Sequence, residues 1–164
     1  MAFSDIFRTV LFGIPVGITI IDVFGYVARV DGVSMQPALN PESNTDYVFL
    51  NKLSVRLYQV SRGDVVALFS PKDPEQKLIK RIIGLEGDVI KTLNYKAPTV
   101  TVPAGHCWVE GDNANNSMDS NLFGPIALAL ITAKATAIVW PPKRWQSVKS
   151  DIPKSRKISL QLEN

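Results

Sequence analysis

The chain has 164 residues, of which 46% are hydrophobic and 20% charged, so it suits one packed domain and is not a globally disordered protein. The net charge is +3, but basic residues are not interleaved with aromatics as in a nucleic-acid-binding surface, and we predict no nucleic acid partner. The single cysteine, Cys107, excludes an internal disulfide. The single histidine, His106, weakens any interpretation that needs a histidine-based triad or a multi-histidine metal site.

Residues 1–8 form a short N-terminal segment, and the twenty residues that follow, 9–28, contain one charged side chain, Asp22. At about 1.5 Å per residue, a helix of this length spans about 30 Å, the thickness of a bilayer core. A cleaved signal peptide fits less well, because Asp22 interrupts the apolar run and Tyr26 stands where a small residue is wanted. A buried helix of a soluble protein is the remaining alternative. We predict a retained, single transmembrane anchor over residues 9–28.

After Arg29 the pattern changes to short runs rich in β-branched and aromatic residues, separated by turn signals such as SRGD, LEGD and PAG. The predicted strands are DYVFLN, DVVALF, KLIKRII, DVIKTL, TVTVP, HCWVEG and TAIVW. ALALITAKA is ambiguous between helix and strand. The prediction is a mostly antiparallel β domain over residues 29–142. Residues 143–164, which are rich in Lys and Arg, are predicted to be a solvated, poorly ordered tail, with contact to anionic lipid as the less favoured alternative.

Ser34 lies in the stretch DGVSMQPALN, directly after the long apolar run, and is either a loop hydroxyl or a nucleophile. A nucleophilic serine needs a base, and a lysine held neutral by burial can supply one. On the predicted strand KLIKRII, Lys80 shares its face with Leu78 and Ile82, and desolvation on such an apolar face lowers the pKa of a lysine. By itself this lysine is more often a strand residue whose amine reaches solvent. Together with Ser34 it forms the hypothesis of a Ser/Lys dyad.

A third stretch, GDNANNSMDSNLFG over residues 111–124, is by itself a polar loop stabilised by Asn and Asp side-chain turns. In their order, SMQP, RGD, KRIIGLEGD and GDN…NSMDS resemble the sequence boxes of the type I signal peptidases, the Ser/Lys membrane proteases. The resemblance covers roughly residues 10–142. It implies a signal-peptidase-like antiparallel β fold, with Ser34 as the nucleophile and Lys80 as the general base.

The resemblance also implies roles for the last box. Ser117 matches a serine that hydrogen-bonds the lysine, and Asp119 and Asp112 match structural acids. Two positions depart from the family. A serine that helps to hold the oxyanion is replaced by Gly32, so the oxyanion hole is expected to rest on backbone N–H groups, chiefly that of Ser34. An arginine usually follows DS, but here the residue is Asn121, and the salt bridge to Asp119 is expected to be lost or taken over by Arg81.

The stretches DGVSMQPALNP, SPKDPEQKLIKRIIGLEGD, VPAGHCWVEGDN and AIVWPPKRW resemble most closely the mitochondrial inner membrane peptidases, the compact eukaryotic branch of the family. This likeness implies a serine endopeptidase, without cofactor or metal, that removes sorting sequences from precursors delivered to the intermembrane space. It implies a single-pass protein of the inner membrane, with the catalytic domain facing the intermembrane space. It also implies a heterodimer with the homologous subunit 1 of that peptidase.

Three alternatives stay open. A non-catalytic assembly subunit of the same complex is disfavoured by the intact Ser34 and Lys80. A bacterial-type signal peptidase is disfavoured by the closer likeness to the mitochondrial branch. A soluble Ser/Lys autoprotease of the SOS-repressor type would need an N-terminal DNA-binding helix-turn-helix, where this chain has the predicted anchor.

Overall fold

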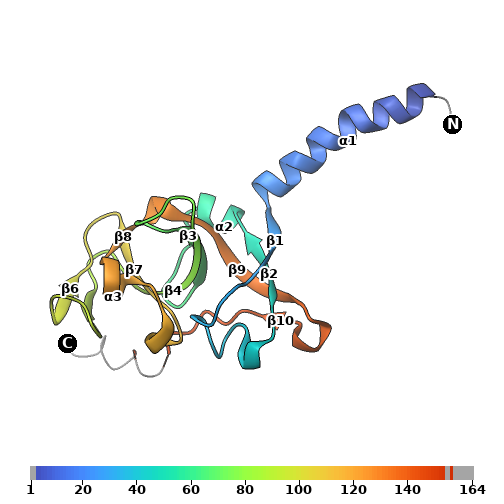
Figure 1. The fold of residues 1–164 in the computed structure, drawn as a ribbon. Coiled ribbons are helices and arrows are strands. Elements are labelled where there is room, and N and C mark those ends of the chain that lie inside the picture. Colours follow the sequence, from blue (N-terminus) through green and yellow to red (C-terminus); the bar gives the residue numbers. More distant parts are fainter. Residues whose placement is uncertain (1–2, 154–155, 157–164) are drawn as a thin grey trace.

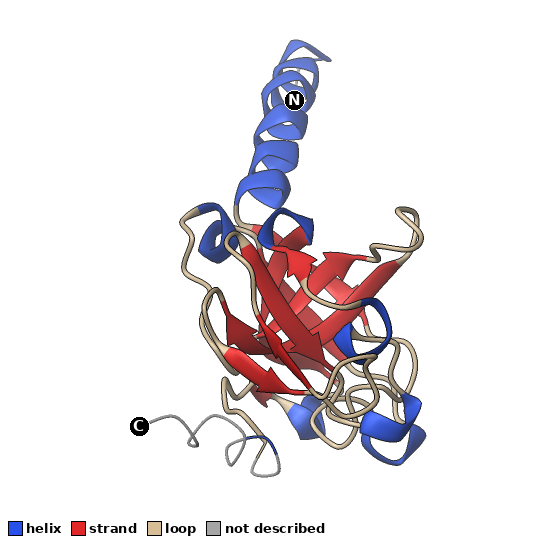
Figure 2. Ribbon diagram, turned by 90° about the vertical axis from the view of Figure 1, so that its left-hand side faces the viewer, coloured by secondary structure: helices blue, strands red, loops and turns tan. Residues whose placement is uncertain are grey.

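The computed structural model describes residues 3–153 and 156, and consists of one long helix followed by a β body (Figure 1). The helix, α1 (Phe3–Val23), projects away from the body, and the strands curve around the body's core (Figures 1 and 2). The outer parts of the predicted N-terminal segment and of the predicted tail, residues 1–2, 154–155 and 157–164, lie outside the described residues.

The surface of α1 exposes large apolar side chains, including Leu11, Phe12 and Ile18. Among the residues that the structure describes, no helix is long and apolar enough to cross a membrane, so the predicted transmembrane helix is not confirmed. Its predicted end at residue 28 is wrong, because the helix stops at Val23 and the next residues form strand β1 (Gly25–Arg29). Gly25 has φ +142°, and a Cβ there would collide with the carbonyl of Leu50 on the neighbouring strand. The apolar residues of β1 extended the helical pattern in the sequence, but in the structure they form the edge strand that pairs with β2.

The β body is built on one sheet in which every pairing is antiparallel. The strand order is β1-β2-β9-β3-β4-β7-β8, and β10 pairs with β9. The strands after β1 are β2 (Tyr47–Asn51), β3 (Val65–Phe69), β4 (Lys77–Leu85), β7 (His106–Glu110), β8 (Ile126–Ala127), β9 (Ile131–Trp140) and β10 (Gln146–Ser147). A separate hairpin joins β5 (Val89–Lys91) and β6 (Thr99–Thr101). The predicted mostly antiparallel β domain is therefore confirmed.

Short helical turns connect the strands. They are η1 (Pro41–Ser43), α2 (Leu53–Arg56), η2 (Ala114–Asn116), α3 (Ser120–Phe123), η3 (Leu128–Leu130) and η4 (Pro142–Arg144). The ambiguous stretch ALALITAKA divides between the end of β8, η3 and the first half of β9. Its pattern was ambiguous because both kinds of element lie within it.

Strand β4 determines where the site lies. It pairs with β3 over Lys77–Arg81, whereas β7 joins its other edge from Arg81 onward. In the described part of the chain, the second edge of β4 before Arg81 therefore has no strand partner. The segment after β1 packs nearby, since Val30, Met35 and Leu39 are buried in the core cluster that also holds residues of β2, β3 and β9. The edge of β4 without a strand partner and the loop anchored by Val30, Met35 and Leu39 thus meet at Lys80.

The C-terminal region corrects the prediction of a solvated tail that begins at residue 143. Strand β10 adds to β9, and Val148 N donates to Thr136 O at 2.9 Å. Arg144 forms two hydrogen bonds of 2.8 and 2.9 Å with the carboxylate of Asp46, which is fully buried. Arg156 is 6% exposed. The charge pattern was misleading because these cations are matched by carboxylates far away in the sequence, so the β body continues beyond residue 142.

Candidate active site

Ser34 lies on a loop, residues 30–40, that is closed by hydrogen bonds to the side chain of Asn40. The Asn40 amide donates to the carbonyls of Val30 and Gly32, at 2.8 and 2.9 Å. Met35, next to Ser34, is 2% exposed and anchors the loop in the core. Because apolar and amide contacts hold both sides of Ser34, its position relative to the sheet is well defined.

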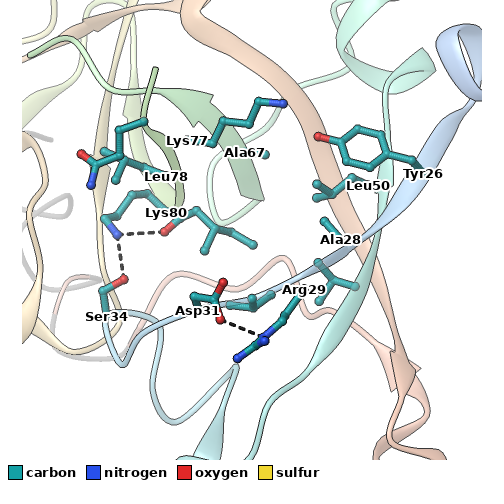
Figure 3. A pocket seen from close by; sticks show the side chains of 14 residues that line it. Tyr26, Ala28, Arg29, Asp31, Ser34, Leu50, Ala67, Lys77, Leu78 and Lys80 are labelled. Carbon is teal, nitrogen blue, oxygen red and sulfur yellow. Dashed lines mark hydrogen bonds and ion pairs between the residues drawn. The ribbon is translucent and has the colours of Figure 1, made fainter. Parts of the chain in front are cut away.

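Lys80 lies directly opposite Ser34. Its Nζ is 2.7 Å from Ser34 Oγ and donates a second hydrogen bond of 2.9 Å to the carbonyl of Ile79 (Figure 3). The side chain is buried, as the strand pattern predicts, with the residue 3% exposed. Burial lowers the pKa of Lys80, while the negative charge of Asp119 acts in the opposite direction. A buried amine with a lowered pKa, in contact with a hydroxyl, is the arrangement in which lysine acts as a base.

A cleft of about 450 Å³ opens beside this pair (Figure 3). Its walls come from β1 and the residues after it on one side, and from Gln76 to Lys80 on the other. Small and medium apolar residues line its interior, among them Ala28, Leu50 and Ala67. The exposed ion pair between Arg29 and Asp31, at 2.9 Å, lies along the wall formed by β1 and the residues after it (Figure 3). Both walls contain strand residues, and a strand edge can hold an extended peptide by main-chain hydrogen bonds.

The predicted last box, residues 111–120, packs against the loop of Ser34. Asn113 N donates to Ser34 O at 3.0 Å, and the Asn113 amide donates to Val33 O at 3.2 Å. A Cβ on Gly111 would collide with Ser117 Oγ and with the Ser34 carbonyl. Gly111 is therefore a residue that the site requires and that the sequence reasoning did not single out, although the GDN stretch contains it.

Asp119 is 3% exposed and organises this box. One carboxylate oxygen accepts a hydrogen bond from Gly111 N at 2.9 Å, and the other accepts from Asn121 N at 3.0 Å, which caps α3. Its negative charge also acts on the pKa of Lys80, which it raises against the effect of burial.

Ser117 and Gly32 differ from what the resemblance implies. Ser117 Oγ is buried and has no hydrogen-bond partner, so the implied bond to Lys80 is not formed. Gly32 has φ +88°, a conformation that strains other residues, although a Cβ there would meet no atom within 4 Å. The absence of a serine at position 32 therefore has a backbone reason, since space alone would allow the side chain.

Of the two expectations for the salt bridge to Asp119, that it is lost or that Arg81 takes it over, the second is wrong. Arg81 makes two hydrogen bonds of 2.7 Å to the carboxylate of Asp112, not to Asp119, and both side chains are buried. Asn121 occupies the place expected for an arginine, and its amide donates to Asp119 and to Glu110, each at 3.2 Å. The sequence reasoning missed Glu110 because a single acidic residue at a strand end has no distinctive pattern.

The described residues contain no group of histidine, cysteine and acidic side chains that could hold a metal ion.

Comparison with known proteins identifies the family of the chain. The family model described as signal peptidase, peptidase S26, matches residues 3–97 and 91–140. The mitochondrial inner membrane protease subunit 2 of Danio rerio is 55% identical over 146 residues, covering 88% of this chain and 80% of the relative. The human protein of the same name is 53% identical, covering 87% and 83%. Human mitochondrial inner membrane protease subunit 1 is 42% identical, covering 82% and 83%.

A solved structure of a signal peptidase I from Enterococcus faecalis is 25% identical, covers 47% of this chain and 97% of its own, and superposes with a TM-score of 0.42. The family model covers most of the β body and α1, and the identity to full-length relatives is well above the level at which membership is in question. The chain therefore belongs to the signal peptidase S26 family and is a serine endopeptidase.

Proposed function

We propose that this chain removes sorting sequences from precursor proteins at the mitochondrial inner membrane, with Ser34 as the nucleophile and Lys80 as the general base. The observation that carries the proposal is the 2.7 Å contact between Ser34 Oγ and the buried Lys80 Nζ. No carboxylate is hydrogen-bonded to this amine among the described contacts, so nothing there holds it in the charged form by direct pairing.

In the proposed reaction, neutral Lys80 takes the proton of the Ser34 hydroxyl while Oγ forms a bond to the carbonyl carbon of the scissile peptide. The Lys80 ammonium then gives this proton to the leaving amine, and the peptide C–N bond breaks. Water then attacks the ester carbon while Lys80 again accepts a proton, the bond between this carbon and Ser34 Oγ breaks, and the Lys80 ammonium returns the proton to Oγ. Because position 32 is glycine, the developing oxyanion is stabilised by backbone N–H groups, chiefly that of Ser34.

Two further residues support the dyad in this proposal. Asp119 holds the Gly111 amide and caps α3, which fixes the box against the Ser34 carbonyl. Ser117 fills the space beside Gly111 and next to Ser34. Ser117 acts through packing, Asp119 acts through its hydrogen bonds and its charge, and neither needs to touch the substrate.

The substrate in this proposal is an extended segment of the precursor. It lies in the cleft between β1 and the unpaired edge of β4, where main-chain hydrogen bonds to strand edges can hold it. Ala28 and Ala67 line the cleft, so the residues before the scissile bond are small. A bulky aromatic side chain directly before the scissile bond is expected to block cleavage.

The cellular setting follows from the relatives, whose names place them at the mitochondrial inner membrane. We propose that the apolar exposed surface of α1 attaches the chain to that membrane and that the β body faces the intermembrane space. The existence of a homologous subunit 1 supports a heterodimer of the two chains.

The dyad is tested by cleavage of a mitochondrial precursor with purified Ser34→Ala and Lys80→Met variants. Each change should reduce cleavage by at least about a thousandfold, and the double variant should be no worse, because the two residues act as one unit. Ser147→Ala and Lys91→Met, both at exposed positions, serve as matched controls and should cleave normally. Normal cleavage by a folded Lys80→Met variant would reject the dyad mechanism.

The complex is tested by affinity purification of a tagged chain from mitochondria in mild detergent. Subunit 1 should co-purify with it in a fixed ratio. A fully active monomer without subunit 1 would contradict the heterodimer but not the dyad.

A further inference from the structure

Arg156, at the described end of the C-terminal region, is a buried cation that lies next to Glu110, the residue before the last box (residues 111–120). Arg156 Nη2 lies 2.6 Å from Glu110 Oε1, and the two side chains are 7% and 5% exposed. Glu110 is the last residue of β7 and directly precedes Gly111. This ion pair is not used in the dyad mechanism.

Glu110 is connected to the site by a continuous series of hydrogen bonds. The oxygen that contacts Arg156 also accepts from Trp108 Nε1 at 2.8 Å and from the Asn121 amide at 3.2 Å. The same Asn121 amide donates to Asp119, and Asp119 in turn accepts from Gly111 N. Gly111 packs against the carbonyl of Ser34. The position of Glu110 is therefore linked, through Asn121 and Asp119, to the groups that hold residues 111–120 against the Ser34 loop.

The chain that leads to Arg156 is itself fixed to the β body. The carbonyl of Lys149 accepts a hydrogen bond from Arg81 Nη1 at 2.8 Å. The backbone of Ser150 and Asp151 packs so closely on Gly63 that a Cβ at position 63 would collide with it, and Gly63 also has φ +89°. Arg156 N donates to Pro153 O at 2.8 Å. Contacts to the backbone of residues 149–151, and the hydrogen bond from Arg156 N to Pro153 O, therefore hold Arg156 in position.

We propose that Arg156 is a positioning residue for the protease reaction, a role that rests on the proposed function of the Ser34–Lys80 dyad. A buried carboxylate without a cation is unfavourable, because the interior solvates the charge poorly. Without Arg156, the buried charge of Glu110 has no partner, and its side chain is expected to turn toward solvent. This movement breaks the hydrogen bonds that Glu110 accepts from Trp108 and Asn121, and weakens with them the contact of Asp119 with Gly111.

The first experiment compares the full-length Arg156→Ala and Arg156→Lys variants with Lys143→Ala, which removes a positive charge from an exposed position of the same region. Cleavage is measured at a temperature at which thermal unfolding shows each variant to be fully native. Arg156→Ala should lower kcat on the order of 10–100-fold with little change in KM, because the dyad is displaced while the cleft is intact. Arg156→Lys should recover part of the loss, and Lys143→Ala should match the unchanged protein.

The second experiment tests whether Arg156 acts through Glu110. Glu110→Gln keeps an oxygen acceptor for Trp108 and Asn121 but removes the buried charge. In the Arg156→Ala background it should restore most of kcat, and it should also restore folding if Arg156→Ala alone does not fold. A double variant as impaired as Arg156→Ala alone would overturn the proposal.

Hydrogen–deuterium exchange provides a readout that does not depend on activity. In Arg156→Ala the amides of residues 111–121 should exchange faster, whereas those of β3 should not change. If Arg156→Ala shows this faster exchange but the unchanged protein itself does not cleave precursors, the proposed function is rejected and the positional role of Arg156 is retained. Unchanged exchange together with an unchanged kcat would reject the positional role.

Discussion

Lys80 and Arg81 are adjacent on β4, and both are buried, with exposures of 3% and 4%. Because successive side chains of a strand point to opposite faces, the two cations lie in different surroundings. Lys80 contacts a hydroxyl and a backbone carbonyl. Arg81 contacts both oxygens of Asp112 and the carbonyls of Gly63 and Lys149.

This difference shows that burial alone does not decide what a cation does. Burial without a paired carboxylate favours the neutral amine, and the pKa of Lys80 is accordingly lowered. Burial with a bidentate carboxylate keeps a guanidinium charged and makes it a structural element. The same strand thus supplies a candidate base on one face and a permanent ion pair on the other.

The largest effect on stability is expected when Arg81 is replaced. Arg81→Met leaves Asp112 buried without a cation and should destabilise the fold by about 3–5 kcal/mol, measured by denaturant unfolding. Arg62→Met is the matched control, because Arg62 pairs with Asp88 at 2.6 Å but is half exposed, and its loss should cost less than about 1 kcal/mol. Equal losses for the two variants would mean that the Arg81–Asp112 pair is not a special feature of the fold.

A smaller effect, of opposite sign, is expected for Lys80→Met. Since the folded pKa of Lys80 is lowered from its ordinary value of 10.5, the unfolded chain binds more protons between the lowered value and 10.5. The resulting destabilisation is complete below the folded pKa, shrinks as the pH rises toward 10.5, and is absent above it. Lys80→Met should therefore be more stable than the unchanged protein at neutral pH.

Thermal unfolding of both proteins at neutral and alkaline pH measures this difference. The gap should close as the pH approaches 10.5. A Lys80→Met variant that is less stable at neutral pH would show that Lys80 is charged and paired like Arg81, and thus is not the base.

The smallest effect is expected for Asp119→Asn, which tests the one carboxylate that acts on Lys80 through its charge. Asparagine is also a good helix cap, so α3 should remain. Removing the negative charge should lower the pKa of Lys80 further, so that the rise of kcat with pH moves to lower pH. The pH–rate profile of the variant measures the shift, and a move to higher pH would exclude a charged Asp119 as its neighbour.

The sequence alone determined the features that depend on local pattern or on motif order. Short runs rich in β-branched and aromatic residues, bounded by turn signals, predict β3, β4 and β7. The apolar face of KLIKRII predicts the burial of Lys80. Ser34 and Lys80 are 46 positions apart, and what connected them was the resemblance of their boxes to a known family, which alternation by itself does not supply.

The tertiary structure decided the features that depend on a distant partner. Arg156 and Glu110 are also 46 positions apart, but neither lies in a recognisable pair of motifs, so the region rich in basic residues resembled a solvated tail. The sequence left open whether Arg81 takes over the salt bridge to Asp119, and only the fold shows that Arg81 pairs with Asp112. The end of α1 was misplaced because Gly25–Arg29 is apolar enough for either element, and its pairing with β2 decides between them. A charged or apolar residue specifies what kind of partner it needs, whereas the path of the chain through space determines which partner it meets.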